Sequence, residues 1–440
     1  MADGAPTVVI RGGRVLGEDG AARADVVVAD GVVVAVGEDE AVPRGATVLD
    51  AAGCLVGPGL VDLHTHLRQP GGEEAETIES GARAAALGGY TAVVAMPNTD
   101  PPIDSAGIAE EVLSLGRSAP CEVLVAGAIT LGRRGEQLAP LRELAALGVR
   151  LFTDDGAGVQ DGGLMRRALE YGRGLGVTLA QHCEDAALAA GGAMHDGEWS
   201  SRLGLPGTPA AAEEAMLARD LALVRQTGAP MHFLHLSTRG SVALLAAARA
   251  EGLPVTAEVT PHHLALTDAS VCGFDPTFKV NPPLRTLEDT LALARALADG
   301  IIDAIATDHA PHPPEAKDLP FDQAPPGMLG LETALSVSMA ALADLLTPEQ
   351  VLARMSAMPA SIAKVSVADR PAASAQGGPI TVGAAANVCV FDPEATWTVD
   401  AGALASRSRN SPYAGMRLLG RVRHTLCAGE PVVIDAQAQR

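Results

Sequence analysis

The chain is short of aromatic residues, paired cysteines and long apolar runs, and each shortage narrows its class. Only 2% of its 440 residues are aromatic, so an aliphatic, Ala- and Gly-rich core is expected. The six cysteines are scattered without a Cys-x-x-Cys pair, which argues against a disulfide scaffold and favours the reducing cytoplasm. No apolar run approaches the roughly 20 residues of a membrane span.

Charge narrows the class further. The net charge of −21 argues against nucleic acid and anionic membranes as partners. Residues 1–6 lack the basic segment and apolar stretch of a secretory signal, which also favours the cytoplasm. Because 48% of the residues are hydrophobic, the chain is expected to fold around a large core rather than remain disordered.

The middle of the chain alternates between apolar, strand-like runs and Ala-rich helical stretches. Eight strands alternating with helices predict a parallel (β/α)8 barrel, a TIM barrel, whose chemistry lies at the carboxyl ends of its strands. The predicted strands are Cys54–Leu63, Tyr90–Met96, Cys121–Ile129, Val149–Thr153, Val177–Gln181, Met231–Leu236, Pro254–Val259 and Ile301–Thr307.

Both ends of the chain have a different texture, with short β-branched runs separated by turn residues. We expect them to join into one small β-sandwich that the barrel interrupts. The predicted limits are 1–57 for its N-terminal part, 58–372 for the barrel and 373–440 for its C-terminal part.

Six candidate metal ligands follow the predicted strands. Histidines two apart on a strand point to the same face, so His64 and His66 can bind one ion together. Four imidazoles and two carboxylates suit Zn²⁺ or a related divalent ion, and they are too many for one open tetrahedral site. Two ions with a shared ligand are therefore expected, held by His64, His66, Asp155, His182, His235 and Asp308.

The shortage of lysine bears on the shared ligand. Many barrel hydrolases with this ligand pattern use a carboxylated lysine as the bridge, but the three lysines here are Lys279, Lys317 and Lys364. None lies between His66 and His182, where the fourth-strand bridge must come from. Asp155 is the natural substitute, and its neighbour Asp154 is the alternative. Asp308 is the best candidate to take a proton from an attacking water and deliver it to a leaving nitrogen.

Several segments together resemble bacterial type I dihydroorotases of the amidohydrolase superfamily. The first signature is 62–70, Asp-Leu-His-Thr-His-Leu-Arg-Gln-Pro, and the second is 306–312, Ala-Thr-Asp-His-Ala-Pro-His. Further family-like segments are 96–99, 154–156, 182–185, 281–285 and 408–413. The resemblance runs over nearly the whole chain.

The resemblance implies reversible, zinc-dependent interconversion of (S)-dihydroorotate and N-carbamoyl-L-aspartate in pyrimidine biosynthesis. It implies one zinc on His64, His66 and Asp308, a second on His182 and His235, and Asp155 as the bridge. The substrate carboxylate would be held by Arg68, Asn98 and His312, and the ring by Asn281. His66 and the backbone of Pro326 and Gly327, where many members have Phe-Gly, would also contact substrate.

Two other functions stay open at this point. Another cyclic amidohydrolase, of the allantoinase or dihydropyrimidinase kind, is disfavoured by the missing bridging lysine and by Arg68, which suits an anionic substrate. A non-catalytic scaffold for aspartate transcarbamoylase is expected to have lost metal ligands, whereas all six are present. The resemblance allows a complex with that transcarbamoylase for an active enzyme too, and a homo-oligomer is expected.

Overall fold

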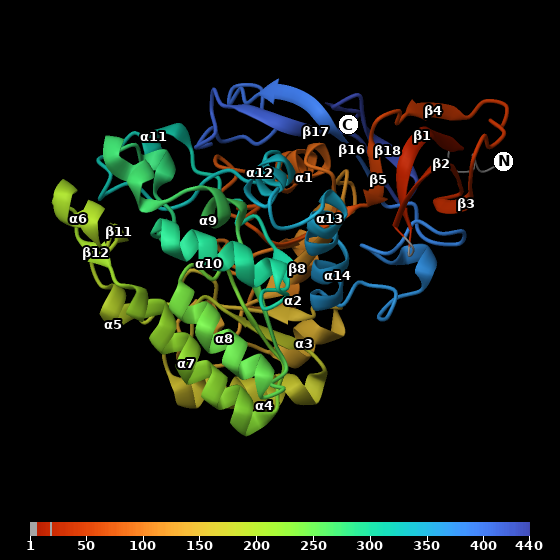
Figure 1. The fold of residues 1–440 in the computed structure, drawn as a ribbon. Helices are drawn as coiled ribbons and strands as arrows, with labels where there is room; N and C mark the ends of the chain where they lie inside the picture. The colour runs from red at the N-terminus through yellow and green to blue at the C-terminus, as the bar shows by residue number, and fades with distance from the viewer. Residues whose placement is uncertain (1–6, 18–19) are drawn as a thin grey trace.

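A ring of eight parallel strands forms the centre of the computed structural model, which describes residues 7–17 and 20–440 (Figure 1). The expectation that no secretory signal is present concerns residues 1–6, outside this range. The ring consists of β6 (Leu60–Thr65), β7 (Tyr90–Ala95), β8 (Glu122–Gly127), β9 (Leu151–Phe152), β10 (Thr178–Gln181), β13 (Met231–Phe233), β14 (Val255–Val259) and β15 (Ala304–Ile305).

The ring closes between its first and last strands. Thr65 at the end of β6 pairs in parallel with His309 beyond β15, and the His66 amide donates to the His309 carbonyl at 2.9 Å. Asp62 adds a side-chain link, because its carboxylate accepts from the Thr307 amide at 2.8 Å. The predicted (β/α)8 barrel is therefore confirmed.

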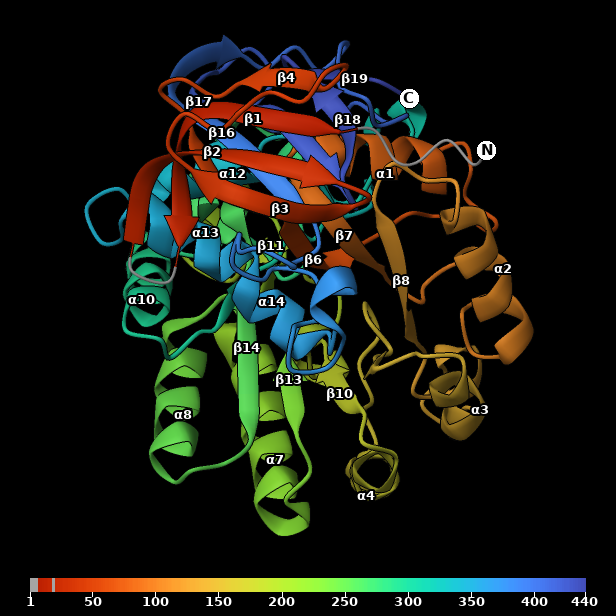
Figure 2. The same cartoon turned by 90° about the vertical axis from the view of Figure 1, so that its right-hand side faces the viewer.

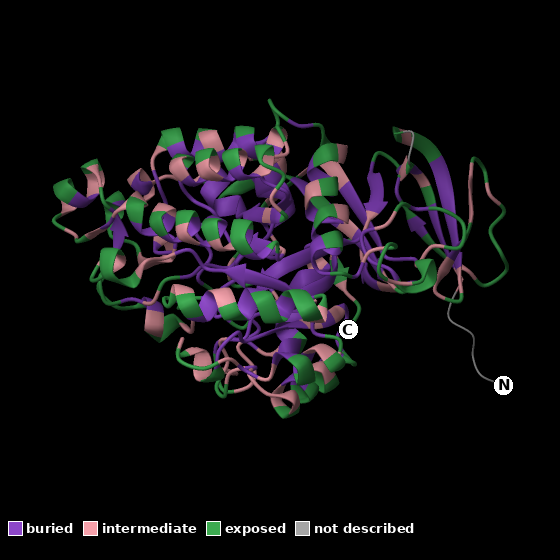
Figure 3. Ribbon diagram, turned by 90° about the horizontal axis from the view of Figure 1, so that it is seen from below, coloured by how far each residue is buried: buried purple, intermediate pink, exposed green. Residues whose placement is uncertain are grey.

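A helix follows each barrel strand and covers its outer face, so that the strands lie buried beneath helices with exposed outer sides (Figure 3). Local signals start these helices: Thr77 caps one and Thr286 another through reciprocal capping boxes. The eight helices are α1 (Ile78–Leu87), α2 (Ala106–Gly116), α3 (Leu141–Ala146), α4 (Gly162–Leu175), α7 (Ala210–Thr227), α8 (Arg239–Ala250), α10 (Leu287–Ala298) and α12 (Ala334–Ala341).

Small and medium apolar side chains fill the barrel interior, among them Val61, Ala92, Ala126 and Ala180. Helix α14 (Ala357–Ile362) and the residues after it pack against this cluster. One end of the barrel is therefore plugged by apolar contacts, and the polar chemistry is left to the other end.

Both chain ends join in one nine-stranded sheet beside the barrel, in which N-terminal and C-terminal strands lie next to each other (Figure 2). Residues from several of its strands pack around a common core that includes Ile10, Val28 and Val388. The strands are β1 (Val8–Gly17), β2 (Gly20–Ala29), β3 (Val32–Gly37), β4 (Thr47–Asp50), β5 (Leu55–Pro58), β16 (Val388–Thr398), β17 (Arg417–Cys427), β18 (Glu430–Ile434) and β19 (Gln437–Ala438).

The structure divides one predicted strand. The apolar run Cys54–Leu63 forms β5 in the nine-stranded sheet and β6 in the barrel, with Gly59 between them. The Gly59 amide donates to the Asn387 carbonyl at 2.8 Å, and any Cβ there would collide with the side chain of Thr91. Apolar character alone did not reveal this change of sheet, and the domain limits stay predictions.

In residues 7–17 and 20–440, none of the helices combines the length and the apolar character needed to cross a membrane.

Candidate metal and substrate site

The six predicted ligands meet at the carboxyl ends of the barrel strands. His64 lies in β6 and His66 just beyond it, while the other four follow β9, β10, β13 and β15. All six side chains are buried. Because every parallel strand ends at the same rim, residues more than 240 positions apart become neighbours, such as His66 and Asp308 at 3.0 Å.

Asp155 lies at the centre of this cluster. Its carboxylate oxygens are 3.3 Å from His64 Nε2 and 3.5 Å from His66 Nε2 on one side. On the other side they are 3.7 Å from His182 Nδ1 and 3.7 Å from His235 Nε2. Asp155 is thus common to two possible ligand groups, one with His64 and His66 and one with His182 and His235.

Its neighbour Asp154 is engaged elsewhere. One Asp154 oxygen accepts from the Ile129 amide at 2.8 Å and the Thr130 amide at 3.0 Å, and the other accepts from the Thr130 hydroxyl. Asp154 therefore fastens the end of β8 to the end of β9. This arrangement favours Asp155 as the bridge, and that role stays a prediction.

The cluster has the chemistry of a cation site. The buried His64 Nε2 and Asp155 Oδ1 have no hydrogen-bond partner among the described residues, which is costly unless another group satisfies them. Burial raises the pKa of Asp155, but His64 and His235 outweigh it and hold that pKa well below its usual value. Burial and the adjacent His235 lower the pKa of His182 to about 3. The ionised Asp155 carboxylate and the neutral His182 imidazole are forms that bind divalent metals, whereas the burial of His64 is outweighed by nearby Asp155 and Asp308, which raise its pKa.

Glu258 in β14 supports two histidines from behind. Its oxygens contact His64 Nδ1 at 2.9 Å and His232 Nε2 at 3.0 Å, so His64 Nε2 is turned toward Asp155. Such outer partners fix the tautomer and orientation of a metal-binding imidazole. Sequence reasoning missed Glu258, although a carboxylate inside the apolar run Pro254–Val259 was a usable signal.

A cavity of about 180 Å³ opens directly above the cluster. Asn98 Oδ1 contacts His66 Nδ1 at 2.8 Å, which turns the Asn98 amide away from that ring. Several candidate metal ligands reach this cavity. All residues predicted to bind substrate line it too, namely His66, Arg68, Asn98, Asn281, His312, Pro326 and Gly327. The structure brings these residues together, and their roles in substrate binding stay predictions.

Arg68 brings an unneutralised positive charge to the cavity. Its Nε donates to the Pro311 carbonyl at 3.1 Å, and among the described residues no carboxylate lies within 4 Å of its guanidinium. Burial lowers the pKa of Arg68, with opposing effects from Asp308 and Asp155, but an arginine stays charged in proteins. A half-buried guanidinium without a counter-ion fits an anionic ligand.

His312 and Gly327 form another part of the cavity wall. His312 Nε2 donates to the Pro326 carbonyl at 2.8 Å, and burial together with Arg68 lowers the pKa of His312 to about 3. Gly327 has a φ of +138°, and a Cβ there would lie 2.8 Å from His312 Nε2. Only glycine lets these two segments approach so closely.

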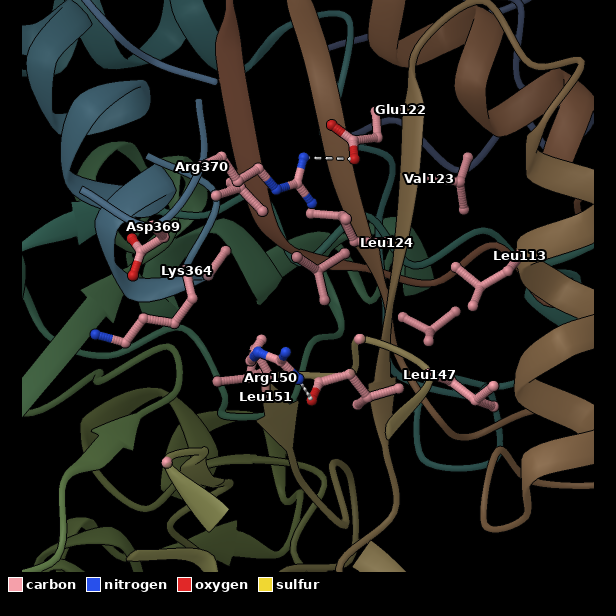
Figure 4. A pocket seen from close by; sticks show the side chains of 17 residues that line it. Leu113, Glu122, Val123, Leu124, Leu147, Arg150, Leu151, Lys364, Asp369 and Arg370 are labelled. Carbon is pink, nitrogen blue, oxygen red and sulfur yellow. Dashed lines mark hydrogen bonds and ion pairs between the residues drawn. The ribbon is translucent and has the colours of Figure 1, made fainter. Parts of the chain in front are cut away.

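A larger cavity of about 630 Å³ lies at the amino-terminal ends of β8 and β9, away from the cluster (Figure 4). Arg370 pairs with Glu122 at 2.8 Å on its wall. The residues that line it within the described chain include no histidine or cysteine. Cavity size alone therefore does not identify the functional site. The smaller cavity is the candidate, because candidate metal ligands line it.

Solved structures place this architecture in the class of cyclic-amide hydrolase barrels. The L-hydantoinase (dihydropyrimidinase) from Arthrobacter aurescens is 25% identical with a TM-score of 0.86, covering 98% of this chain and 97% of its own. A D-hydantoinase crystal structure is 23% identical with a TM-score of 0.83, covering 98% and 96%, and shows the fold alone.

Sequence comparison then identifies the family. A dihydroorotase from Mycobacterium tuberculosis (strain ATCC 25618 / H37Rv) is 48% identical over 98% of this chain and 99% of its own. One from Streptomyces coelicolor (strain ATCC BAA-471 / A3(2) / M145) is 48% identical with the same coverage. The family described as "Dihydro-orotase-like" matches residues 53–241. This chain belongs to the dihydroorotase family.

The two adjacent aspartates should differ sharply in metal binding. Asp155→Asn removes the central charge, and we expect it to lose most bound metal after dialysis against a weak chelator. Asp154→Asn should retain its metal while lowering the melting temperature, because it weakens the tie between β8 and β9. Elemental analysis of both variants checks this, and the reverse order of metal loss would assign the bridge to Asp154.

Glu258→Gln should weaken metal binding about 10- to 100-fold, the usual effect of removing an outer partner of a metal-binding imidazole. Competition with a chromogenic chelator measures the change. Asp303→Asn is the matched control, because Asp303 is a buried carboxylate at the other end of the barrel that accepts from the Ala257 amide at 2.9 Å. Equal affinities in the two variants would remove the role given to Glu258.

Proposed function

We propose that this chain catalyses reversible hydrolysis of (S)-dihydroorotate to N-carbamoyl-L-aspartate, a step of de novo pyrimidine biosynthesis. Family membership supports the reaction. The observation that carries the choice of substrate is the Arg68 guanidinium, which meets no carboxylate among the described residues and lies at the wall of a cavity above the metal-ligand cluster. A ring amide bearing a carboxylate needs both features, one for the reacting carbonyl and one for the charge.

The proposal includes two zinc ions per subunit. One zinc would be held by His64, His66 and Asp308, and the other would be held by His182 and His235. Asp155 would be shared by both. The distances around Asp155, none above 3.7 Å, support this division. When bound, such a pair polarises the carbonyl under attack and lowers the pKa of a water to about 7.

Asp308 is proposed to move the proton. One of its oxygens lies 3.0 Å from His66 Nε2 and 3.5 Å from His64 Nε2, and Asp308 also lines the cavity. Burial would raise the pKa of Asp308, but His64 and His66 hold it far below its usual value, so the side chain is ionised. Water adds to the ring acyl carbon, the carbon–nitrogen bond breaks, and Asp308 returns the proton to the departing ureido nitrogen.

The remaining polar groups are proposed to orient the substrate. Arg68, Asn98 and His312 would hold its carboxylate, and Asn281, whose Nδ2 lies 3.4 Å from His182 Nε2, would contact the ring. The backbone of Pro326 and Gly327 would bind the opposite edge. Such fixed donors reduce the entropy that must be lost to reach the reacting geometry.

The rival functions fit the site less well. Neutral ring amides such as dihydrouracil and unsubstituted hydantoin lack the carboxylate that would neutralise Arg68. A scaffold without activity would have no need to keep six ligands assembled and buried. The proposal also includes a homo-oligomer and a complex with aspartate transcarbamoylase in the cytoplasm, where six free cysteines would stay reduced.

Turnover of (S)-dihydroorotate before and after metal removal is the decisive measurement. We expect hydrolysis to disappear when metal is stripped at low pH with a chelator and to return with added zinc. The change in ultraviolet absorbance as the ring opens follows the reaction directly. If zinc-loaded protein leaves dihydroorotate intact but opens dihydrouracil, the neutral-substrate rival is correct.

Arg68→Met should raise KM for dihydroorotate with little change in metal content. Loss of a charge-assisted contact costs about 1.5–3 kcal/mol, or roughly 10- to 150-fold in affinity. Steady-state kinetics and elemental analysis of the same preparation check both points. A KM that stays at the unmutated value would show that the carboxylate binds elsewhere.

A further inference from the structure

Asn410 lies in the C-terminal segment, in a family-like motif (408–413) to which neither the metal site nor the substrate contacts assign a role. We propose that Asn410 is a positioning residue that holds His312 and Gly327 at the spacing that substrate binding needs. The inference rests on the proposed function, because His312 and Gly327 form the part of the cavity wall, here called the substrate wall, that is proposed to bind substrate. Asn410 itself does not line the cavity.

The side chain of Asn410 contacts both segments of that wall. Its Nδ2 donates to the Ala310 carbonyl at 3.0 Å and to the Gly327 carbonyl at 3.1 Å. Its Oδ1 accepts from the His312 amide at 3.2 Å. Asn410 is 3% exposed, so both amide hydrogens are used in a site that water does not compete for.

The wall has little other regular structure. The last barrel strand ends at Ile305, and beyond it the two segments are joined by the His309–Met328 bridge. The Ala310 amide donates to the Met328 carbonyl at 2.9 Å, and beyond it the segments are joined through side chains, one of them His312, whose Nε2 donates to the Pro326 carbonyl. Asn410 spans them where the backbone ladder has ended.

The segment that bears Asn410 is itself anchored to the barrel. The Ser406 hydroxyl donates to Glu76, and the Arg407 amide donates to the same carboxylate at 3.1 Å. The Ser408 hydroxyl donates to the Ala75 carbonyl at 2.8 Å. Glu76 also lies 3.3 Å from His309 Nε2, the residue that closes the barrel. Because its own segment is held in place, Asn410 can hold the backbone of His312 and Gly327 in place through its hydrogen bonds.

The chain offers a matched control in Asn387. This buried asparagine also joins two backbone segments, with Nδ2 donating to the Ala375 carbonyl at 3.0 Å and Oδ1 accepting from the Ala428 amide at 2.7 Å. Its contacts lie away from the residues that line the substrate cavity. Asn387→Ala should therefore cost stability without altering the wall.

The experiment compares Asn410→Ala and Asn387→Ala in zinc-loaded full-length protein. We expect Asn410→Ala to raise KM for dihydroorotate about tenfold or more, the effect of losing one or two buried hydrogen bonds. Its zinc content should be unchanged and its kcat should fall less than KM rises. Hydrogen exchange at the His312 amide should become faster in this variant and stay slow in Asn387→Ala.

The outcomes separate the two proposals. An unchanged His312 exchange rate, or a KM rise matched by Asn387→Ala, would overturn the role of Asn410 and leave the proposed function standing. If unmutated protein fails to open dihydroorotate, the proposed function fails, and the exchange rate still decides whether Asn410 holds the wall. Should Asn410→Ala not fold, Asn410→Asp keeps the acceptor for His312 and removes both donors, and the same KM rise is expected.

Discussion

The interaction on which this site depends is a buried carboxylate shared by four imidazoles. Asp155 lies within 3.7 Å of His64, His66, His182 and His235, in surroundings where ionised groups are expensive to desolvate. Attraction among these side chains offsets only part of that cost, since His64 Nε2 and Asp155 Oδ1 are among the buried polar atoms that lack partners in the described residues. A divalent cation would satisfy them, so the cluster gains stability from the ion that it is proposed to use.

Barrel closure is what brings such charges together. Asp62 joins β6 to the segment after β15, Asp154 joins the ends of β8 and β9, and Glu258 orients His64. The hydrogen bonds of these three carboxylates hold parts of the barrel together, whereas Asp155 and Asp308 face the cavity. The chain thus uses carboxylates for two tasks, and the partners of each carboxylate decide which task it performs.

The nine-stranded sheet contributes to the site although its described residues supply no candidate metal ligand and line no part of the substrate cavity. Segment 406–411 returns from it to the barrel rim, where Glu76 receives it and Asn410 contacts both sides of the substrate wall. The segment between β16 and β17 thus joins the sheet to the barrel rim.

Much of the molecule followed from the sequence, because apolar periodicity and polar residues after strands are local properties. They predicted the eight-stranded barrel, which the structure confirms, and the candidate metal ligands, and the shortage of lysine pointed to an aspartate as the candidate bridge. Only the tertiary structure showed that Asp154 is bonded to the end of β8, divided Cys54–Leu63 between two sheets, and brought in Glu258 and Asn410. Those outcomes depend on contacts between residues far apart in the chain, which local sequence patterns do not encode.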